Sequence, residues 1–199
     1  MALITFAHAW KEIVRFANEA LSEVQSDQVD KMVKWIIEAK DRRILIIGVG
    51  RSGLVGRSFA MRMMHLGFDV YVMGETITPA IGKGDLIIAI SGSGTTKLVV
   101  TASEIAKEVG AKIIAITSHR DSDLGKLADH IVLVKGRTKV SGETDYFLRQ
   151  ITGAHEPLAP LGTVFEVSAL IFFDSIVVEL MRTLGKTEKD MLSRHATIE

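Results

Sequence analysis

Two loops rich in glycine and hydroxyl residues have the composition of phosphate-binding sites. The first, GVGRSG at residues 48–53, follows the apolar run 44–47 and precedes a helical pattern. Glycines at such a turn allow backbone amides to approach a phosphate at the positive end of the following helix. A dinucleotide such as NAD would also need an acidic residue about 20 positions further on, which Glu75 would supply. The first loop therefore leaves open a dinucleotide, a phosphorylated sugar and a tight turn without a ligand.

The second loop, SGSGTT at residues 91–96, favours a phosphorylated sugar. It follows the apolar run 86–90 and again precedes a helical pattern. Its hydroxyls and glycines supply O–H and N–H donors that converge on the oxygens of a phosphate monoester. Hydroxyl-rich turns also serve as helix caps, so one such loop alone would leave the matter open. A dinucleotide fold needs no second loop of this kind, and two loops at corresponding positions predict a phosphosugar site.

Glu166 is the candidate proton acceptor. It lies within the apolar segment 163–180, between Phe165 and Val167. Burying an unpaired charge is costly, so this carboxylate must be paired, neutral or functional. Desolvation raises the pKa of a carboxyl group, which makes it a better base at neutral pH. The structural alternative is a salt bridge across a subunit interface. Arg51 in the first loop suits a bidentate contact with phosphate or, alternatively, an exposed position in the loop.

Other reactive groups are sparse. The chain has no cysteine, which excludes a thiolate nucleophile, a disulfide and a Cys-ligated metal. Its six histidines show neither HxH nor HExxH spacing. We therefore expect no metal and no cofactor. By itself, His195 in the polar tail has the pattern of a solvated side chain.

The elements that must position these residues alternate along the chain. Apolar runs without polar alternation are typical of strands covered on both faces. Strands that alternate with helices predict a doubly wound, five-stranded parallel sheet, with both loops facing one crevice at its switch point. The expected strands are 44–47, 70–73, 86–90, 113–116 and 131–134, and the expected helices between them are 52–66, 95–109 and 122–128.

The length of 199 residues predicts a single domain, 1–199. Within it we expect an arm of amphipathic helices (1–40), a core sheet that carries both loops (41–135), a loop or lid (136–160), and a long apolar helix with a polar tail (161–199). The helix includes Glu166, Asp174 and Glu179, which speaks against membrane insertion.

The balance of acidic and basic residues argues against nucleic acid and acidic membranes as partners. Lys and Arg together number 24, as do Asp and Glu, so the formal net charge is zero. Such a chain has no electrostatic footprint for nucleic acid or acidic membranes. The amino terminus lacks the pattern of a signal peptide, and we expect a soluble, cytoplasmic protein.

The two loops together resemble the sugar isomerase (SIS) domain family, whose second signature has the form Ser-x-Ser-Gly-x-Thr. The resemblance continues into GTVFE at residues 162–166, the segment that carries the base glutamate in SIS isomerases. It ends at His195, which is similar to the family's carboxy-terminal catalytic histidine. It covers nearly the whole chain and implies a flavodoxin-like α/β fold that binds a phosphosugar without a cofactor.

The resemblance also implies roles for individual residues. Glu166 would be the carbon base, and His195 would reach the site of a neighbouring subunit. The residues that would hold the substrate phosphate are Ser52, Ser91, Ser93 and Thr96, with further substrate contacts at Gly50, Arg51, Gly92 and Gly94.

Within the family, the chain length, Arg51 and the ending SRHATIE most resemble the 6-phospho-3-hexuloisomerases. These interconvert D-arabino-hex-3-ulose 6-phosphate and D-fructose 6-phosphate through a cis-enediol, in the ribulose monophosphate pathway of formaldehyde assimilation. Another SIS isomerase, acting on a pentose or heptose phosphate, and a non-catalytic phosphosugar-binding module are the alternatives.

Surplus apolar surface predicts assembly. The terminal helices carry more apolar residues than one such sheet needs, and large exposed apolar patches mark interaction sites. We expect Phe6, Trp10, Phe172 and Phe173 to be shared between subunits. The family resemblance implies a homotetramer, a dimer of dimers with shared active sites.

Overall fold

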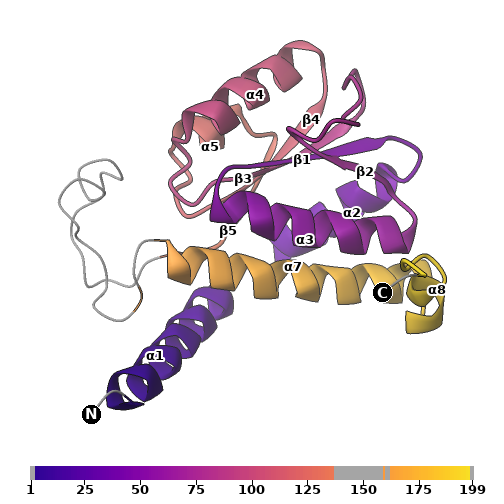
Figure 1. The fold of residues 1–199 in the computed structure, drawn as a ribbon. Helices are drawn as coiled ribbons and strands as arrows, with labels where there is room; N and C mark the ends of the chain where they lie inside the picture. Colours follow the sequence, from indigo (N-terminus) through magenta and orange to yellow (C-terminus); the bar gives the residue numbers. More distant parts are fainter. Residues whose placement is uncertain (1–2, 137–158, 160–161, 198–199) are drawn as a thin grey trace.

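The computed structural model describes residues 3–136, 159 and 162–197, and a five-stranded parallel sheet lies at its centre (Figure 1). The strand order β2-β1-β3-β4-β5 confirms the expected doubly wound sheet. The expected loop or lid at 136–160 lies almost wholly outside the described residues. The elements are α1 (Leu3–Ser22), α2 (Ser26–Glu38), β1 (Arg43–Gly48), α3 (Arg51–Leu66), β2 (Asp69–Val72), β3 (Leu86–Ile90), α4 (Lys97–Glu108), β4 (Lys112–Thr117), α5 (Asp123–Leu127), β5 (His130–Leu133), α7 (Thr163–Leu184) and α8 (Glu188–Leu192).

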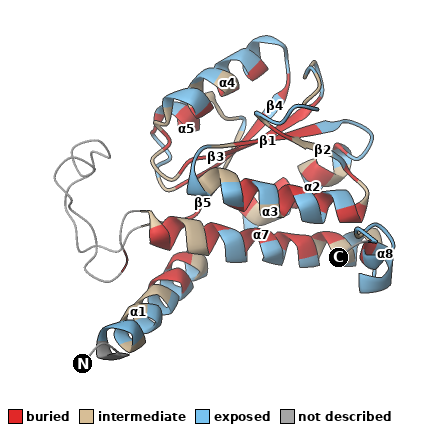
Figure 2. Ribbon diagram, viewed as in Figure 1, coloured by how far each residue is buried: buried red, intermediate tan, exposed pale blue. Residues whose placement is uncertain are grey.

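The central strands are apolar throughout because helices cover both faces of the sheet. Successive side chains of a strand point to opposite faces. On β1, Ile44 and Ile46 therefore pack beneath α2, α3 and α7, whereas Leu45 and Ile47 pack beneath α4 and α5. β3 lies in the middle, and all five of its residues are buried (Figure 2).

The two edge strands differ from the prediction. The run 70–73 was expected to be covered on both faces, yet β2 is largely half-exposed, and so is β5. Each has a neighbouring strand on one side only, and the flanking helices leave part of its surface open. Apolar composition alone does not separate an edge strand from a central one.

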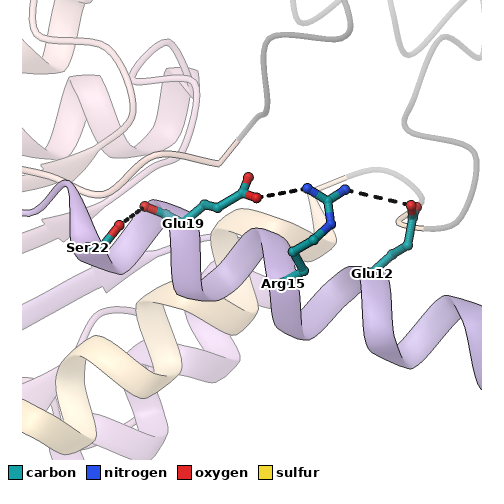
Figure 3. Close-up of polar contacts among 4 residues, drawn as sticks. All are labelled: Glu12, Arg15, Glu19 and Ser22. Carbon is teal, nitrogen blue, oxygen red and sulfur yellow. Dashed lines mark hydrogen bonds and ion pairs between the residues drawn. The ribbon is translucent and has the colours of Figure 1, made fainter.

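α1 extends away from the sheet and packs mainly against α7 (Figure 1). Phe16 of α1 and Val164 of α7 belong to one small apolar cluster. On its solvent side, Arg15 Nη1 donates a hydrogen bond to Glu19 Oε1 at 2.8 Å, and Glu12 lies 3.7 Å from Nη2 (Figure 3). Such pairs three and four residues apart stabilise a helix by only about 0.2–0.5 kcal/mol each. The packing of α1 against α7 must therefore keep α1 in its position.

The carboxy-terminal region also departs from the prediction in two respects. Phe172 and Phe173, which we expected to be shared between subunits, are buried in this chain's own core beneath α3. The polar tail contains the short helix α8, which begins with a capping box between Thr187 and Asp190 and buries Met191. By contrast, Phe6 and Trp10 on α1 are exposed, as an interface role would require. None of the helices described here is long and apolar enough to cross a membrane.

Gly48 permits the close contact between β1 and α3 on which the first loop depends. A Cβ atom at residue 48 would lie 2.9 Å from the backbone oxygen of Ser52. Backbone atoms cannot move aside as a flexible side chain can. We predict that Gly48→Ala lowers the free energy of unfolding by about 1–3 kcal/mol, the usual cost of overpacking.

Urea denaturation measures this change. Gly82→Ala is the matched control, because a Cβ atom there would meet nothing within 4 Å. Equal stabilities of the two variants would contradict the close contact.

Candidate active site

The two glycine-rich loops begin side by side at the carboxyl edge of the sheet. β1 and β3 are neighbouring parallel strands whose register pairs Gly48 with Ile90, so they end at the same level. α3 then packs over one face and α4 over the other. This is the topological switch point, where open parallel sheets bind their ligands. Both helices start at these loops, and their positive dipole ends lie at the same edge.

The second loop is held by its own hydroxyl groups. The Oγ of Ser91 lies 3.0 Å from Oγ1 of Thr96 and accepts a hydrogen bond from the Gly94 amide. Ser91 is only 3% exposed, so the structure places it inside the loop. Ser93 and Thr96 are half-exposed. Thr96 is the N-cap of α4 but makes no side-chain cap hydrogen bond, so helix capping does not account for its hydroxyl.

α7 begins against both loops. A Cβ atom on Gly92 would lie 2.9 Å from Cδ1 of Phe165, so the backbone of the second loop touches this ring. The next residue is Glu166, whose Oε2 lies 3.0 Å from Nε of Arg51 in the first loop. The structure thus brings together both loops and the predicted base.

Arg51 joins the first loop to the first turn of α7 through two contacts. Besides the ion pair with Glu166, its Nη1 donates a hydrogen bond to Oγ1 of Thr163 at 3.2 Å. The contact with Glu166 is electrostatic, because Oε2 is buried and accepts no well-aligned hydrogen bond from the described residues. The salt bridge considered as an alternative for Glu166 therefore exists, but within one chain.

Burial gives Glu166 the electrostatics of a base. Its side chain is 14% exposed, against 53% for Arg51. Desolvation raises the pKa of Glu166 above its ordinary value, and the positive charge of Arg51 opposes part of that increase. A carboxylate with a raised pKa accepts a proton more readily at neutral pH.

In the folded structure of a single subunit, the side chain of His195 lies far from that of Glu166. Its ring centroid is 5.2 Å from that of His65, near the carboxyl end of α3. The Arg51 end of α3 is about 20 Å away at 1.5 Å per residue. Figure 1 likewise shows α8 at the opposite end of α7 from its start. His195 therefore does not complete the Glu166 site of its own chain.

The other residues that the sequence singled out lie at several places in the fold. Glu75, which a dinucleotide would need for its ribose, lies 3.5 Å from Arg57 of α3. Within the described part of the chain, no three His, Cys, Asp or Glu side chains are grouped to hold a metal ion. Gly50 and Gly94 have positive φ angles, of 59° and 67°, at the two loops. Ser52 lies in the first turn of α3.

Sequence reasoning missed Thr163 and Phe165 as parts of the site. Thr163 contacts Arg51, and Phe165 contacts the second loop. Both are buried residues within one turn of Glu166. Their position in the first turn of an apolar helix was the available signal, but nothing in the sequence identified which loop they would touch.

The raised pKa of Glu166 has a consequence for stability. A group whose pKa is higher in the folded protein stabilises the fold below its unfolded pKa, and this contribution is lost as pH rises through the folded pKa. We predict that Glu166→Gln is more stable than the unaltered protein near pH 8 and gains little near pH 4. Arg51 is half-exposed, so water can solvate it in the variant.

Urea denaturation at both pH values measures this difference. Glu75→Gln, which removes an exposed carboxylate from its pair with Arg57, is the control and should show no such gain. A loss of stability near pH 8 in Glu166→Gln would contradict the desolvated carboxylate.

Comparison with known proteins identifies the family of the chain. Residues 36–155 match the SIS domain family. An uncharacterized protein of Aeropyrum pernix is 52% identical over 94% of this chain and 90% of its own. The 3-hexulose-6-phosphate isomerase of Bacillus subtilis is 33% identical over 94% of this chain and 96% of its own.

A solved structure is similar over almost the whole fold. It is that of a hypothetical protein from Methanococcus jannaschii, for which the structure infers a function of 3-hexulose-6-phosphate isomerase. Its TM-score is 0.76 at 35% identity, with 95% of this chain and 96% of that chain covered. The family match spans both glycine-rich loops, and these relatives extend it over nearly the full length. The chain therefore belongs to the SIS domain family.

Proposed function

We propose that the protein is a 6-phospho-3-hexuloisomerase, which interconverts D-arabino-hex-3-ulose 6-phosphate and D-fructose 6-phosphate. Family membership and the named isomerases among its relatives establish the broader class, an isomerase of phosphosugars. The observation that carries the proposal is the desolvated carboxylate of Glu166 beside two phosphate-type loops. Burial raises the pKa of this carboxyl group, and the side chain lies within the first turn of α7 next to both loops.

In this proposal the two loops anchor the phosphate. Ser93 and Thr96 donate hydroxyl hydrogen bonds, and backbone amides at the starts of α3 and α4 add N–H donors. Ser52 lies at the same edge on the first turn of α3. Ser91 keeps the loop in shape through Thr96. The phosphate is remote from the reacting carbons, so its binding energy can hold the sugar in place for the chemistry.

The chemical steps exchange the keto group between C3 and C2. The carboxylate of Glu166 removes the proton from C2 of the 3-ulose, while the C3 carbonyl oxygen receives a proton. This forms the cis-enediol. Return of a proton to C3, with loss of the proton on the C2 oxygen, yields the 2-ulose. No electrons leave the sugar, so the reaction needs no redox cofactor.

The second group in the mechanism is His195 of a neighbouring subunit. It would open the ring of fructose 6-phosphate or move protons between the two oxygens. The position of His195, about 20 Å along α3 from Arg51, is compatible with action in a neighbour's site. The exposed Phe6 and Trp10 of α1 supply apolar surface for assembly. We propose a cytoplasmic homotetramer, a dimer of dimers, acting in the ribulose monophosphate pathway.

Proton exchange with solvent tests the reaction. Fructose 6-phosphate incubated with the protein in deuterated water should acquire deuterium next to its carbonyl and yield the 3-ulose, as followed by NMR. A pentose or heptose phosphate that turns over faster would favour another SIS isomerase. Binding without any deuterium uptake would indicate a non-catalytic phosphosugar-binding module.

Variants then assign the roles. Glu166→Gln should bind fructose 6-phosphate normally but lose deuterium uptake, because the phosphate loops are intact and the base is absent. Ser93→Ala and Thr96→Ala should mainly raise KM, each by the equivalent of about 1.5–3 kcal/mol for a hydrogen bond to a charged group. Uptake at the unaltered rate in Glu166→Gln would exclude it as the base.

A subunit-mixing experiment tests the shared site. Glu166→Gln and His195→Ala should each be inactive alone, whereas hybrid oligomers would pair an intact base with an intact histidine and recover activity. Light scattering should give the mass of four chains. A fully active monomer, or no recovery in hybrids shown by mass spectrometry to have formed, would contradict the proposal.

A further inference from the structure

Arg51 lies where two anions would compete for it. It stands between Gly50 and Ser52 in the first loop, at the start of α3, where the proposed function places the substrate phosphate. Its side chain nevertheless reaches across to α7 and lies 3.0 Å from the carboxylate of Glu166. Because the side chain is 53% exposed, a ligand can approach the guanidinium from solvent. One planar cation thus lies between the expected phosphate and the expected base.

We propose that Arg51 is a counter-ion shared between Glu166 and the substrate phosphate, and that Thr163 is the positioning residue that holds its guanidinium between them. This inference rests on the proposed function. Before substrate binds, Arg51 offsets part of the cost of burying the carboxylate and keeps it in place. When the phosphate dianion binds, the guanidinium turns its donors to it, and Glu166 is left as a desolvated, unpaired base beside the sugar.

The contacts around Glu166 favour this exchange. The carboxylate meets Arg51 without a well-aligned hydrogen bond, and Oε2 accepts none from the described residues. Arginine binds phosphate through strong, often bidentate hydrogen bonds, so the phosphate is the better partner. Thr163 accepts a hydrogen bond from Nη1 and is buried, so it can keep hold of the guanidinium while Nε changes partner.

Few other charges bear on Glu166. α3 contributes the guanidinium of Arg51, and the second loop contributes hydroxyls but no charged side chain. Among the groups that the structure describes, Arg51 is the one charge that alters the pKa of this carboxyl, which it lowers against the larger effect of burial. Movement of Arg51 to the phosphate would therefore raise the pKa of Glu166 when the substrate arrives, and not before.

NMR titration of the Glu166 carboxyl carbon tests the exchange directly. The protein carries ¹³C-labelled glutamate, and Glu166→Gln assigns the signal. The ligand is glucitol 6-phosphate, which has no carbonyl and cannot be isomerised, and glucitol is the control without phosphate. We expect glucitol 6-phosphate, but not glucitol, to raise the pKa of Glu166. In Arg51→Gln this pKa should be high already and should respond less to the ligand.

Matched variants separate this role from a structural one. Arg57→Gln removes another arginine of α3 with the same 53% exposure and its own ion pair, and should change neither the pKa nor binding. Arg51→Gln should weaken glucitol 6-phosphate binding roughly ten- to a hundredfold, and Thr163→Val roughly two- to tenfold. Thr163→Ser, which keeps the acceptor oxygen, should restore binding. In turnover, the acid limb of the pH profile of kcat/KM, which reports the free enzyme, should move to higher pH in Arg51→Gln. The acid limb of the pH profile of kcat, which reports the substrate complex, should move less.

The outcomes distinguish the two proposals. If glucitol 6-phosphate does not bind, the phosphosugar site and the shared counter-ion both fail. If it binds and fructose 6-phosphate is isomerised, but the ligand raises the pKa of Glu166 equally in Arg51→Gln and in the unaltered protein, the phosphate charge acts alone. The proposed function then stands and the shared counter-ion is wrong. Equal effects of Thr163→Val and Thr163→Ser would exclude Thr163 as the positioning residue.

Discussion

The contact between α7 and the carboxyl edge of the sheet is the constraint on which the site depends. α7 packs lengthwise against α3 and buries Phe172 and Phe173 beneath it. At its first turn, Phe165 fills the space that a side chain at Gly92 would need. These apolar contacts hold the backbone of α7 so that Glu166 has to lie beside the two loops. The favourable packing of the apolar neighbours of Glu166 offsets the cost of placing a carboxylate in a largely buried position.

The site combines two requirements that pull against each other. Phosphate binding needs positive dipoles, hydroxyls and an arginine, all of which favour negative charge nearby. A carbon base at neutral pH needs a raised pKa, which burial supplies and a cation opposes. In the proposed mechanism both requirements are met because Glu166 is largely buried and Arg51 is half-exposed. Arg51 therefore moderates the base without neutralising the effect of burial.

Different elements lie at the two ends of α7. α8 and His195 pack against the carboxyl end of α3, where His65 is buried. α1 extends from the start of α7, with Phe6 and Trp10 exposed. Because Glu166 and His195 lie at opposite ends of α7, the proposed reaction requires the two residues to come from different subunits. The mechanism proposed above depends on such sharing.

The sequence by itself determined the fold class and the places of the five strands along the chain, and it identified the two loops and Glu166 as candidates for the site. Each of these has a local signature: unbroken apolar runs for buried strands, glycine next to hydroxyl residues for the loops, and a carboxylate between apolar neighbours near the start of an apolar helix. Tertiary structure alone decided that Arg51 pairs with Glu166, that Thr163 and Phe165 belong to the site, and that Phe172 and Phe173 are internal. It also decided which strands lie at the edges and that the tail folds into α8. These outcomes depend on contacts between residues up to 115 positions apart, such as Arg51 and Glu166, and no local pattern of residue types encodes which distant partner a side chain will meet.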